Sequence, residues 1–327
     1  RSVSVMKVTR SMLHSDLEPF YGRFRHVGVI VRFRWLALLI NFLLKHFAAG
    51  KDIDGLDCEE RFLTSADGGN EIRVRIFKPK EQKHPLPILV YLHGGGYVLG
   101  NPEMSAAVIR RFIESRPCIV VAPDYRKAHT APFPAGFNDC YDTLVWAANH
   151  ADSFGGRADA VIVAGHSAGG GLTAAVTMKA RDCGGVKVAF QMPIYPMIDD
   201  LQPSDLDRHI EVCVWDTKTN RLAWSAYLAN LHSRGDVIPA YAAPARCIDF
   251  RGLPPTITFV GSLEPFFWET KSYVASLREA GVEVAFEEFE NCFHGFDTIA
   301  VGTNISKAAL DYTFTQFADF YDRYTRS

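Results

Sequence analysis

The sequence predicts an α/β fold with a mostly parallel central sheet, helices on both faces of the sheet and a helical cap. Two observations lead to this prediction. Apolar runs of strand length alternate with stretches of helical periodicity along most of the 327 residues, as they do where crossover helices cover a parallel sheet. Some of these runs, such as residues 85–93, are almost entirely apolar, which is typical of strands buried on both faces.

The expected elements alternate in chain order. Residues 1 to about 50 have helical character without strand alternation. Residues 71–79 alternate apolar and polar side chains, as a half-exposed strand does. Strands are expected at 71–79, 85–93, 118–125, 160–167, 187–196, 256–260 and 282–289, and helices at 105–116, 139–151, 171–182, 270–280 and 305–324.

The alternation stops between residues 199 and 249, where the sequence is polar and has helix and loop character. We interpret residues 199–249 as an insertion that folds together with the N-terminal helices of residues 1–50 to form the cap. The α/β core then consists of residues 51–198 and 250–327. A hydrophobic content of 48% is sufficient for one large core of this kind.

Residues 35–44, WLALLINFLL, form the longest apolar run near the N-terminus, between Arg34 and Lys45. A membrane-spanning helix needs about 20 apolar residues, so this run is too short to span. We expect a helix packed on the protein's own core or cap, with a helix on a membrane surface as the less favoured alternative. Because the chain begins at Arg1, a removed leader is compatible with the sequence.

Charge and cysteine content argue against several classes of function. The net charge is −2, and no basic block marks a nucleic-acid surface. The seven cysteines are scattered and form no CxxC pair, so no metal or redox site is expected. We therefore expect free thiols, a cytoplasmic location and no cofactor. A homodimer is compatible with this composition, and so is membrane contact, although membrane contact is not expected.

Residues 160–169, AVIVAGHSAG, place a G-x-S-x-G pattern between a buried strand and a helix. This context is typical of a nucleophile elbow and not of an ordinary glycine-rich turn, so Ser167 is the predicted nucleophile. The flanking glycines leave room for the tight turn. The N–H of Ala168 lies at a helix N-terminus, where developing negative charge is favoured.

A second glycine-rich loop, HGGG at residues 93–96, follows the strand expected at 85–93. Such a loop supplies further N–H donors to an oxyanion, and we expect the amides of Gly94 and Gly95 to do so. His93 is expected to order the loop. A phosphate-binding loop is the alternative, but both glycine patterns of such loops are absent from the sequence.

A serine nucleophile needs a base, and imidazole is the usual one. Of the eleven histidines, only His294 lies in a loop after the last strand-like run with a glycine behind it. This position suits the chain order nucleophile, acid, histidine. Glu264, just after the run 256–260, is the predicted acid that holds His294 in its tautomer. Glu269 is expected to begin the next helix, and Asp297 follows the histidine and so breaks the order.

Together, these motifs resemble the hormone-sensitive-lipase-like branch of the α/β-hydrolases over about residues 70–325. The resemblance implies the α/β-hydrolase fold and a carboxylic ester hydrolase without metal or cofactor. It also implies a small-molecule ester substrate with a short or medium acyl chain, and an acyl-enzyme intermediate. The motifs are H-G-G-G at 93–96, G-x-S-A-G-G at 165–170, and the stretches 124–146, 195–199 and 294–296.

Three positions depart from the pattern of that branch. His166 stands where an Asp usually precedes the serine, and RKAHT at 126–130 replaces R-L-A-P-E. The acid lies in the sequence Glu264-Pro265-Phe266, where the branch usually has Asp, so its side chain is one methylene longer. The sequence leaves open whether this glutamate reaches the imidazole.

Two alternative functions stay open at this point, because fold alone does not fix function. One is a non-catalytic small-molecule receptor on the same scaffold, and the other is an amidase or deformylase that uses the same triad. For an esterase, part of the pocket is expected to be aromatic, although the same side chains also suit a core. The pocket candidates are Tyr97, His166, Met197, Trp215, Phe266 and Phe267.

Overall fold

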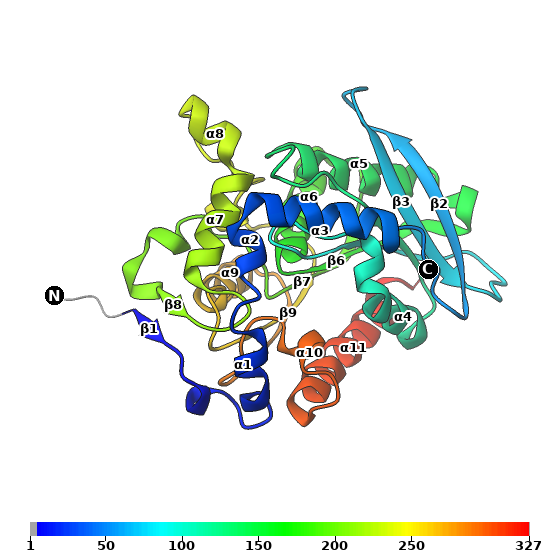
Figure 1. Ribbon diagram of the computed structural model, residues 1–327. Helices are drawn as coiled ribbons and strands as arrows, with labels where there is room; N and C mark the ends of the chain where they lie inside the picture. The colour runs from blue at the N-terminus through cyan, green and yellow to red at the C-terminus, as the bar shows by residue number, and fades with distance from the viewer. Residues whose placement is uncertain (1–4, 327) are drawn as a thin grey trace.

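The computed structural model describes residues 5–326, so residues 1–4 of the predicted cap lie outside the described part. Its centre is an eight-stranded sheet in the order β10-β9-β7-β6-β4-β5-β3-β2, with helices packed around it (Figure 1). The strands are β2 (Leu56–Thr64), β3 (Glu71–Pro79), β4 (Leu86–Leu92), β5 (Ile119–Pro123), β6 (Gly156–His166), β7 (Val188–Ile194), β9 (Thr256–Gly261) and β10 (Val284–Phe289).

The pairing is parallel from β10 through β5, and antiparallel where β3 joins β5 and β2 joins β3. The predicted mostly parallel sheet is thus confirmed. Strand β2 has no counterpart among the expected strands, because charged residues such as Glu59, Glu60 and Arg61 obscure its alternation. Pairing with β3 along its whole length holds it in place.

Both faces of the sheet are buried, because successive side chains of a strand point to opposite faces. In β4, Val90 belongs to one apolar cluster, and its neighbour Leu89 belongs to the cluster on the other face. Helices α5 (Ala135–Asn149) and α6 (Ala168–Cys183) contribute to the first cluster, whereas α4 (Ala106–Ser115) and α11 (Asn304–Tyr324) contribute to the second. The remaining core helices are α9 (Phe267–Glu279) and α10 (Phe296–Ile299).

The N-terminal segment and residues 199–249, which we continue to call the cap, contact each other. Strand β1 (Met6–Lys7) pairs in parallel with β8 (Ile210–Glu211), and Arg32 Nη2 lies 2.9 Å from Asp216 Oδ2. The expectation of a purely helical N-terminus is therefore wrong at β1, which depends on a long-range partner. The cap helices are α1 (Tyr21–Phe24), α2 (Val29–Arg32), α3 (Arg34–Phe47), α7 (Thr217–Tyr227) and α8 (Ala229–Arg234).

The apolar run 35–44 does form a helix, α3, but the expectation that it packs on the core or cap is only half correct. Of its residues, Ala37 alone is fully buried. Trp35, Phe42 and Phe47 are 65%, 56% and 70% exposed. In Figure 1, α3 lies across the outside of the molecule with no other element over it. One face of this helix is therefore apolar and open to solvent.

Candidate active site

The parallel strands β4, β6, β9 and β10 end at the same edge of the sheet, and the loops that follow them bring the predicted site residues together. Ser167 lies between β6 and α6 with φ 60° and ψ −121°. A positive φ is rare for a residue with a Cβ, and such strain concentrates at functional turns. The turn presents the hydroxyl of Ser167 at the carboxyl end of the central strand, as a nucleophile elbow does.

The glycines of G-x-S-x-G are required by close backbone approach. A Cβ at Gly169 would lie 1.9 Å from the carbonyl oxygen of Leu92. A Cβ at Gly165 would lie 2.3 Å from the carbonyl oxygen of Gly169. No side chain fits at either distance, so the elbow closes only because both positions lack a side chain.

Ser167, His294 and Glu264 form one hydrogen-bonded chain. His294 Nε2 lies 2.8 Å from Ser167 Oγ, and His294 Nδ1 lies 2.7 Å from Glu264 Oε1. The second carboxylate oxygen, Oε2, accepts a hydrogen bond of 3.2 Å from the amide of Gly261. The side chains of Ser167, Glu264 and His294 are all buried. The longer glutamate thus reaches the imidazole while its other oxygen is held by the end of β9.

Aromatic rings fix the plane of the His294 imidazole. The ring of Tyr195 lies 4.7 Å from it at an interplanar angle of 73°, and the ring of Phe266 lies 4.9 Å away at 86°. Both are edge-to-face contacts, which aromatic pairs favour. With Glu264 at Nδ1, these contacts leave Nε2 directed at Ser167.

The carboxylate of Asp297 has a different partner from that of Glu264. Its Oδ1 accepts a hydrogen bond of 3.0 Å from the hydroxyl of Tyr195, which itself packs against His294. Burial raises the pKa of Asp297 from 3.8 to about 6, because a low-dielectric environment disfavours the charged form. Asp297 is therefore hydrogen-bonded to the tyrosine that packs on the imidazole and not to the imidazole itself.

Glu269 lies in the first turn of α9, as expected, but its carboxylate accepts hydrogen bonds from residues outside this helix. Its Oε2 accepts hydrogen bonds of 2.8 Å from the amides of Ile198 and Asp199. Burial, followed by the nearby charge of Asp199, raises the pKa of Glu269 well above its usual value. Glu269 thus ties α9 to the point where the chain enters the cap insertion.

Two of the residues predicted to bind an oxyanion, Gly94 and Gly95, line the same cavity as Ser167, and the third, Ala168, follows Ser167 in the chain. Gly94 lies so close to the elbow that a Cβ on it would be 2.9 Å from the carbonyl oxygen of His166 and 3.4 Å from the Cβ of Ser167. Within residues 5–326, the amides of Gly94, Gly95 and Ala168 donate no hydrogen bond. They are therefore available as donors beside the hydroxyl.

The oxyanion loop is held by two hydrogen bonds to Asn41, which the sequence did not reveal, and by His93, which was expected to order it. The side-chain amide of Asn41, in α3, donates to the carbonyl of Val98 over 2.8 Å, and its oxygen accepts from the amide of Gly100 over 3.1 Å. His93 contacts the carbonyl of Gly94 through Nδ1 at 2.7 Å and stacks on Tyr125 at 4.3 Å. No local pattern marks Asn41, because it lies inside the apolar run of a helix far away in sequence.

His166 contributes a second imidazole to the site. Its Nδ1 lies 2.9 Å from the hydroxyl of Tyr91. Burial, followed by the proximity of His294, lowers the pKa of His166 to about 3, so the side chain is neutral near pH 7. The residue in the position before the nucleophile is therefore an uncharged polar group where a carboxylate is usual.

A cavity of about 270 Å³ opens beside Ser167 and His294. Of the predicted pocket residues, His166 and Trp215 line it. Tyr97 and Met197 are instead buried, and the hydroxyl of Tyr97 donates a hydrogen bond of 2.7 Å to the carbonyl oxygen of Met197. Phe266 packs against the imidazole of His294. Phe267 packs against Trp268 and Lys271 on α9. The lining side chains that were not predicted are Tyr91, Met104, Ser105, Val108, Tyr195, Val214, Thr298 and Ile299.

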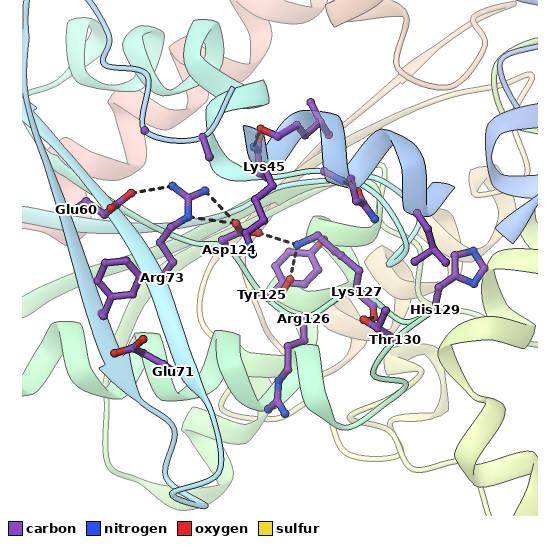
Figure 2. A pocket seen from close by; sticks show the side chains of 18 residues that line it. Lys45, Glu60, Glu71, Arg73, Asp124, Tyr125, Arg126, Lys127, His129 and Thr130 are labelled. Atoms are coloured by element: carbon purple, nitrogen blue, oxygen red, sulfur yellow. Dashed lines mark hydrogen bonds and ion pairs between the residues drawn. The ribbon is translucent and has the colours of Figure 1, made fainter. Parts of the chain in front are cut away.

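A larger cavity, of about 720 Å³, lies between α3, the β2–β3 hairpin and residues 124–130. Figure 2 shows Arg73 directed toward Glu60 and Asp124, and Lys127 directed toward Asp124. Arg73 pairs with Glu60 and Asp124 at 3.2 and 3.0 Å, and Lys127 pairs with Asp124 at 3.0 Å. Because these charges are satisfied within the protein, we identify the smaller cavity, which contains Ser167, as the candidate active site.

The described residues contain no cluster of His, Cys, Asp and Glu that could hold a metal ion. All seven cysteines are free thiols, four of them buried. The hydroxyl and imidazole groups that line the cavity around Ser167 suit proton transfer and hydrogen bonding to a substrate.

Comparison with known proteins gives consistent matches. A family model described as the alpha/beta hydrolase fold matches residues 89–298. Carboxylesterase NlhH of Mycobacterium tuberculosis is 33% identical over 250 residues, which cover 75% of this chain and 77% of that protein. An arylesterase of Saccharolobus solfataricus is 28% identical over 227 residues, 69% and 73% of the two chains.

Solved structures agree with these matches. A bacterial heroin esterase has a TM-score of 0.87 and 29% identity over 96% of this chain and 99% of its own. Esterase LipW from Mycobacterium marinum has a TM-score of 0.78 and 25% identity over 98% and 99%. The region matched by the family model contains Ser167, Glu264 and His294 as well as the loop at 93–96.

Proposed function

The chain belongs to the hormone-sensitive-lipase-like branch of the α/β-hydrolase family and is a serine carboxylesterase, and we propose that it hydrolyses short- to medium-chain esters through Ser167, His294 and Glu264. The observation that carries this proposal is the hydrogen-bonded chain from Ser167 Oγ through the imidazole to Glu264. A nucleophile, a base and an orienting acid within hydrogen-bond reach of one another are the parts that covalent catalysis by serine requires.

In the first half of the proposed reaction, Ser167 Oγ attacks the carbonyl carbon of the ester while His294 Nε2 takes the hydroxyl proton. Glu264 keeps the proton on Nδ1 in place and stabilises the imidazolium that forms. The imidazolium then gives its Nε2 proton to the departing alcohol oxygen, the carbon–oxygen bond breaks, and the acyl group stays on Ser167.

In the second half, water takes the place of the alcohol. His294 Nε2 accepts a proton from water as the water oxygen attacks the acyl carbon. It then returns the proton to Ser167 Oγ as that bond breaks. The products are a carboxylic acid and the free enzyme, and no other reactant is consumed.

The unpaired amides of Gly94, Gly95 and Ala168 are the proposed donors to the tetrahedral oxyanion. Among the described residues, none of the three amides donates a backbone hydrogen bond to another group. No such hydrogen bond must therefore be broken when charge develops on the substrate oxygen. Loss of one such donor typically costs about 3 kcal/mol of barrier. Asn41 and His93 support this step by fixing the loop from which two of the donors come.

The size of the cavity supports the proposed range of substrates. Ligand pockets for drug-sized molecules begin at about 300 Å³, and the cavity beside Ser167 measures about 270 Å³. Trp215 limits it, because its ring packs directly over Gly96, where a Cβ would lie 2.3 Å from the indole. Short acyl groups fit such a space without displacement of the indole.

Hydrolysis of p-nitrophenyl acetate and p-nitrophenyl butyrate tests the proposal. The wild-type protein is expected to turn over both esters, and Ser167→Ala is expected to remove turnover while leaving the circular dichroism spectrum unchanged. A folded wild-type protein without turnover on a panel of short esters would contradict the proposed reaction.

A further inference from the structure

Helix α3 exposes an apolar face that no part of the described protein covers. Its large apolar side chains at positions 35, 39, 42, 43 and 47 are each more than two-fifths exposed, and Phe33, just before the helix, is half exposed. Residues three and four apart lie on one side of a helix, so these side chains form one continuous surface. Such exposed apolar patches on proteins mark interaction sites. We call this surface the α3 face.

The chain segment that carries the α3 face has basic residues and no acidic ones. Residues 19–51 contain no Asp or Glu, whereas the chain as a whole has a net charge of −2. Arg32 is paired with Asp216; the other basic residues of this segment are exposed. Basic side chains around an apolar helical face are the pattern of helices that lie in the interface of anionic membranes. The exposed basic residues are Arg23, Arg25, Arg34, Lys45 and Lys51.

We propose that the α3 face binds the surface of an anionic lipid bilayer. The apolar side chains enter the region between headgroups and acyl chains, and the basic side chains contact the anionic headgroups. Trp35 lies at the start of the helix, where its amphipathic indole suits the interface, and Phe47 at the other end adds apolar surface. We place α3 in the plane of the membrane, because its exposed apolar side chains follow one side of the 14-residue helix along its whole length. Among the described residues, no single helix is both long and apolar enough to cross a membrane, and the only pair that passes this test together, Glu18–Arg32 and Arg34–Phe47, is bent by 100°.

The charge pattern favours lipid over a second copy of this chain. In a symmetric dimer the same patch meets itself, so the basic residues around the α3 face would approach those of the partner and repel them. An anionic lipid surface instead neutralises them. Lipid therefore satisfies both the apolar face and its basic surroundings.

The fold already holds the helix in a binding geometry. On the side opposite the exposed face, Asn41 is bonded to the backbone at Val98 and Gly100, and the side chain of Asn101 donates to the carbonyl of Leu44. The α3 face is thus presented on a rigid support. Binding requires no unfolding or displacement of the helix, which keeps the entropic cost of association low.

Vesicle co-sedimentation of the full chain tests this proposal. Vesicles of phosphatidylcholine mixed with phosphatidylglycerol are compared with vesicles of phosphatidylcholine alone. Wild-type protein is expected to bind the mixed vesicles more tightly. The triple variant Trp35→Ser, Phe42→Ser, Phe47→Ser is expected to stay in the supernatant with both kinds of vesicle. A matched control with three exposed apolar residues elsewhere changed, Val237→Ser, Ile248→Ser and Val301→Ser, is expected to bind as wild type does.

A charge variant separates the two parts of the surface. Arg34→Gln, Lys45→Gln and Lys51→Gln together are expected to weaken binding to the mixed vesicles by about fivefold for each basic residue removed, with little effect on neutral vesicles. All variants should hydrolyse p-nitrophenyl acetate at the wild-type rate, because none alters the site around Ser167. Circular dichroism gives a check of folding that is independent of the esterase proposal.

Three outcomes would overturn the proposal. The wild-type protein could stay in the supernatant with both kinds of vesicle, or the triple variant could sediment with the mixed vesicles as much as wild type does. In the third, light scattering would show a dimer for wild type and a monomer for the triple variant, and neither protein would bind vesicles. This third result would assign the α3 face to self-association.

Discussion

Glu264 Oε1 lies 2.7 Å from His294 Nδ1, so the carboxylate closes the hydrogen-bonded chain although its side chain is one methylene longer than that of an aspartate. The extra length is accommodated because Oε2 is fixed by the amide of Gly261, three residues earlier. The carboxylate is therefore bonded through both oxygens and holds one orientation. Burial removes competing water from this contact.

Two glutamates in the same segment allow a matched test of the acid. Glu264→Gln is expected to lower kcat by about 10³- to 10⁴-fold, because an amide neither fixes the imidazole tautomer nor stabilises the imidazolium. Glu269→Gln keeps an oxygen that accepts hydrogen bonds from residues 198 and 199, so its kcat should stay near that of wild type. Steady-state kinetics with p-nitrophenyl acetate measures both, and the reverse ranking would refute the assignment of Glu264.

The reach of the acid can be tested by shortening it. Glu264→Asp retains the charge but moves the carboxylate away from Nδ1 of His294 by about one carbon–carbon bond. We expect kcat between those of the wild type and Glu264→Gln, because the charge still stabilises the imidazolium from a longer distance. Activity equal to or above wild type would show that this site is not matched to the length of the glutamate.

Asp297 makes stability depend on pH in a defined window. The folded protein keeps the proton of this carboxyl up to about pH 6, whereas the ordinary pKa is 3.8, so the free energy of unfolding decreases as pH rises between these values. Asp297→Asn removes the ionisation and can still accept from Tyr195. The free energy of unfolding of this variant should exceed that of wild type by up to about 3 kcal/mol above pH 6 and should equal it near pH 4. Urea unfolding across this range measures the difference, and a difference independent of pH would contradict the account.

Asn41 is a positioning residue for the oxyanion loop. Asn41→Ala removes the contacts to Val98 and Gly100 and changes none of the residues proposed to take part in catalysis. We expect kcat to fall by about tenfold to a hundredfold with a smaller change in KM, because misplaced donors act mainly on the transition state. An unchanged kcat, or a loss confined to thermal stability, would mean that Asn41 only supports the fold.

Trp215 sets the size of the cavity beside Ser167. Trp215→Leu enlarges this space, so the ratio of kcat/KM for p-nitrophenyl hexanoate to that for the acetate should increase. The expected change is about tenfold, since a methylene or two in an apolar pocket is worth 1–3 kcal/mol. The control is Trp268→Leu, which alters an exposed tryptophan outside the cavity. Equal ratios in the two variants would place the acyl chain elsewhere.

Much of the fold could be predicted because the core strands and helices have strong local patterns. The sheet edge could not, since β2 is rich in charge and depends on its pairing with β3. The N-terminal strand β1 was missed for the same reason, as β8 lies about 200 residues away. The exposed side of α3 was misjudged because an apolar run indicates a helix but not which surface covers it.

For the candidate site, chain order and turn motifs were sufficient to select Ser167, Glu264 and His294, which the fold brings into contact; their catalytic roles stay predictions. Pocket residues were harder to predict. Tyr97 and Met197 lie close to the motifs in sequence, yet their side chains point into the core. Side-chain direction there depends on backbone dihedrals such as the positive φ of Tyr97, which the sequence does not display.

Covalent labelling with a fluorophosphonate tests the central claim most directly, because it reports an activated serine without the natural substrate. The account predicts one adduct per chain, mapped by peptide mass spectrometry to Ser167, and no adduct in Ser167→Ala or after denaturation. Glu264→Gln should be labelled much more slowly than wild type. An adduct on another serine, or none on the folded wild-type protein, would contradict the proposed triad.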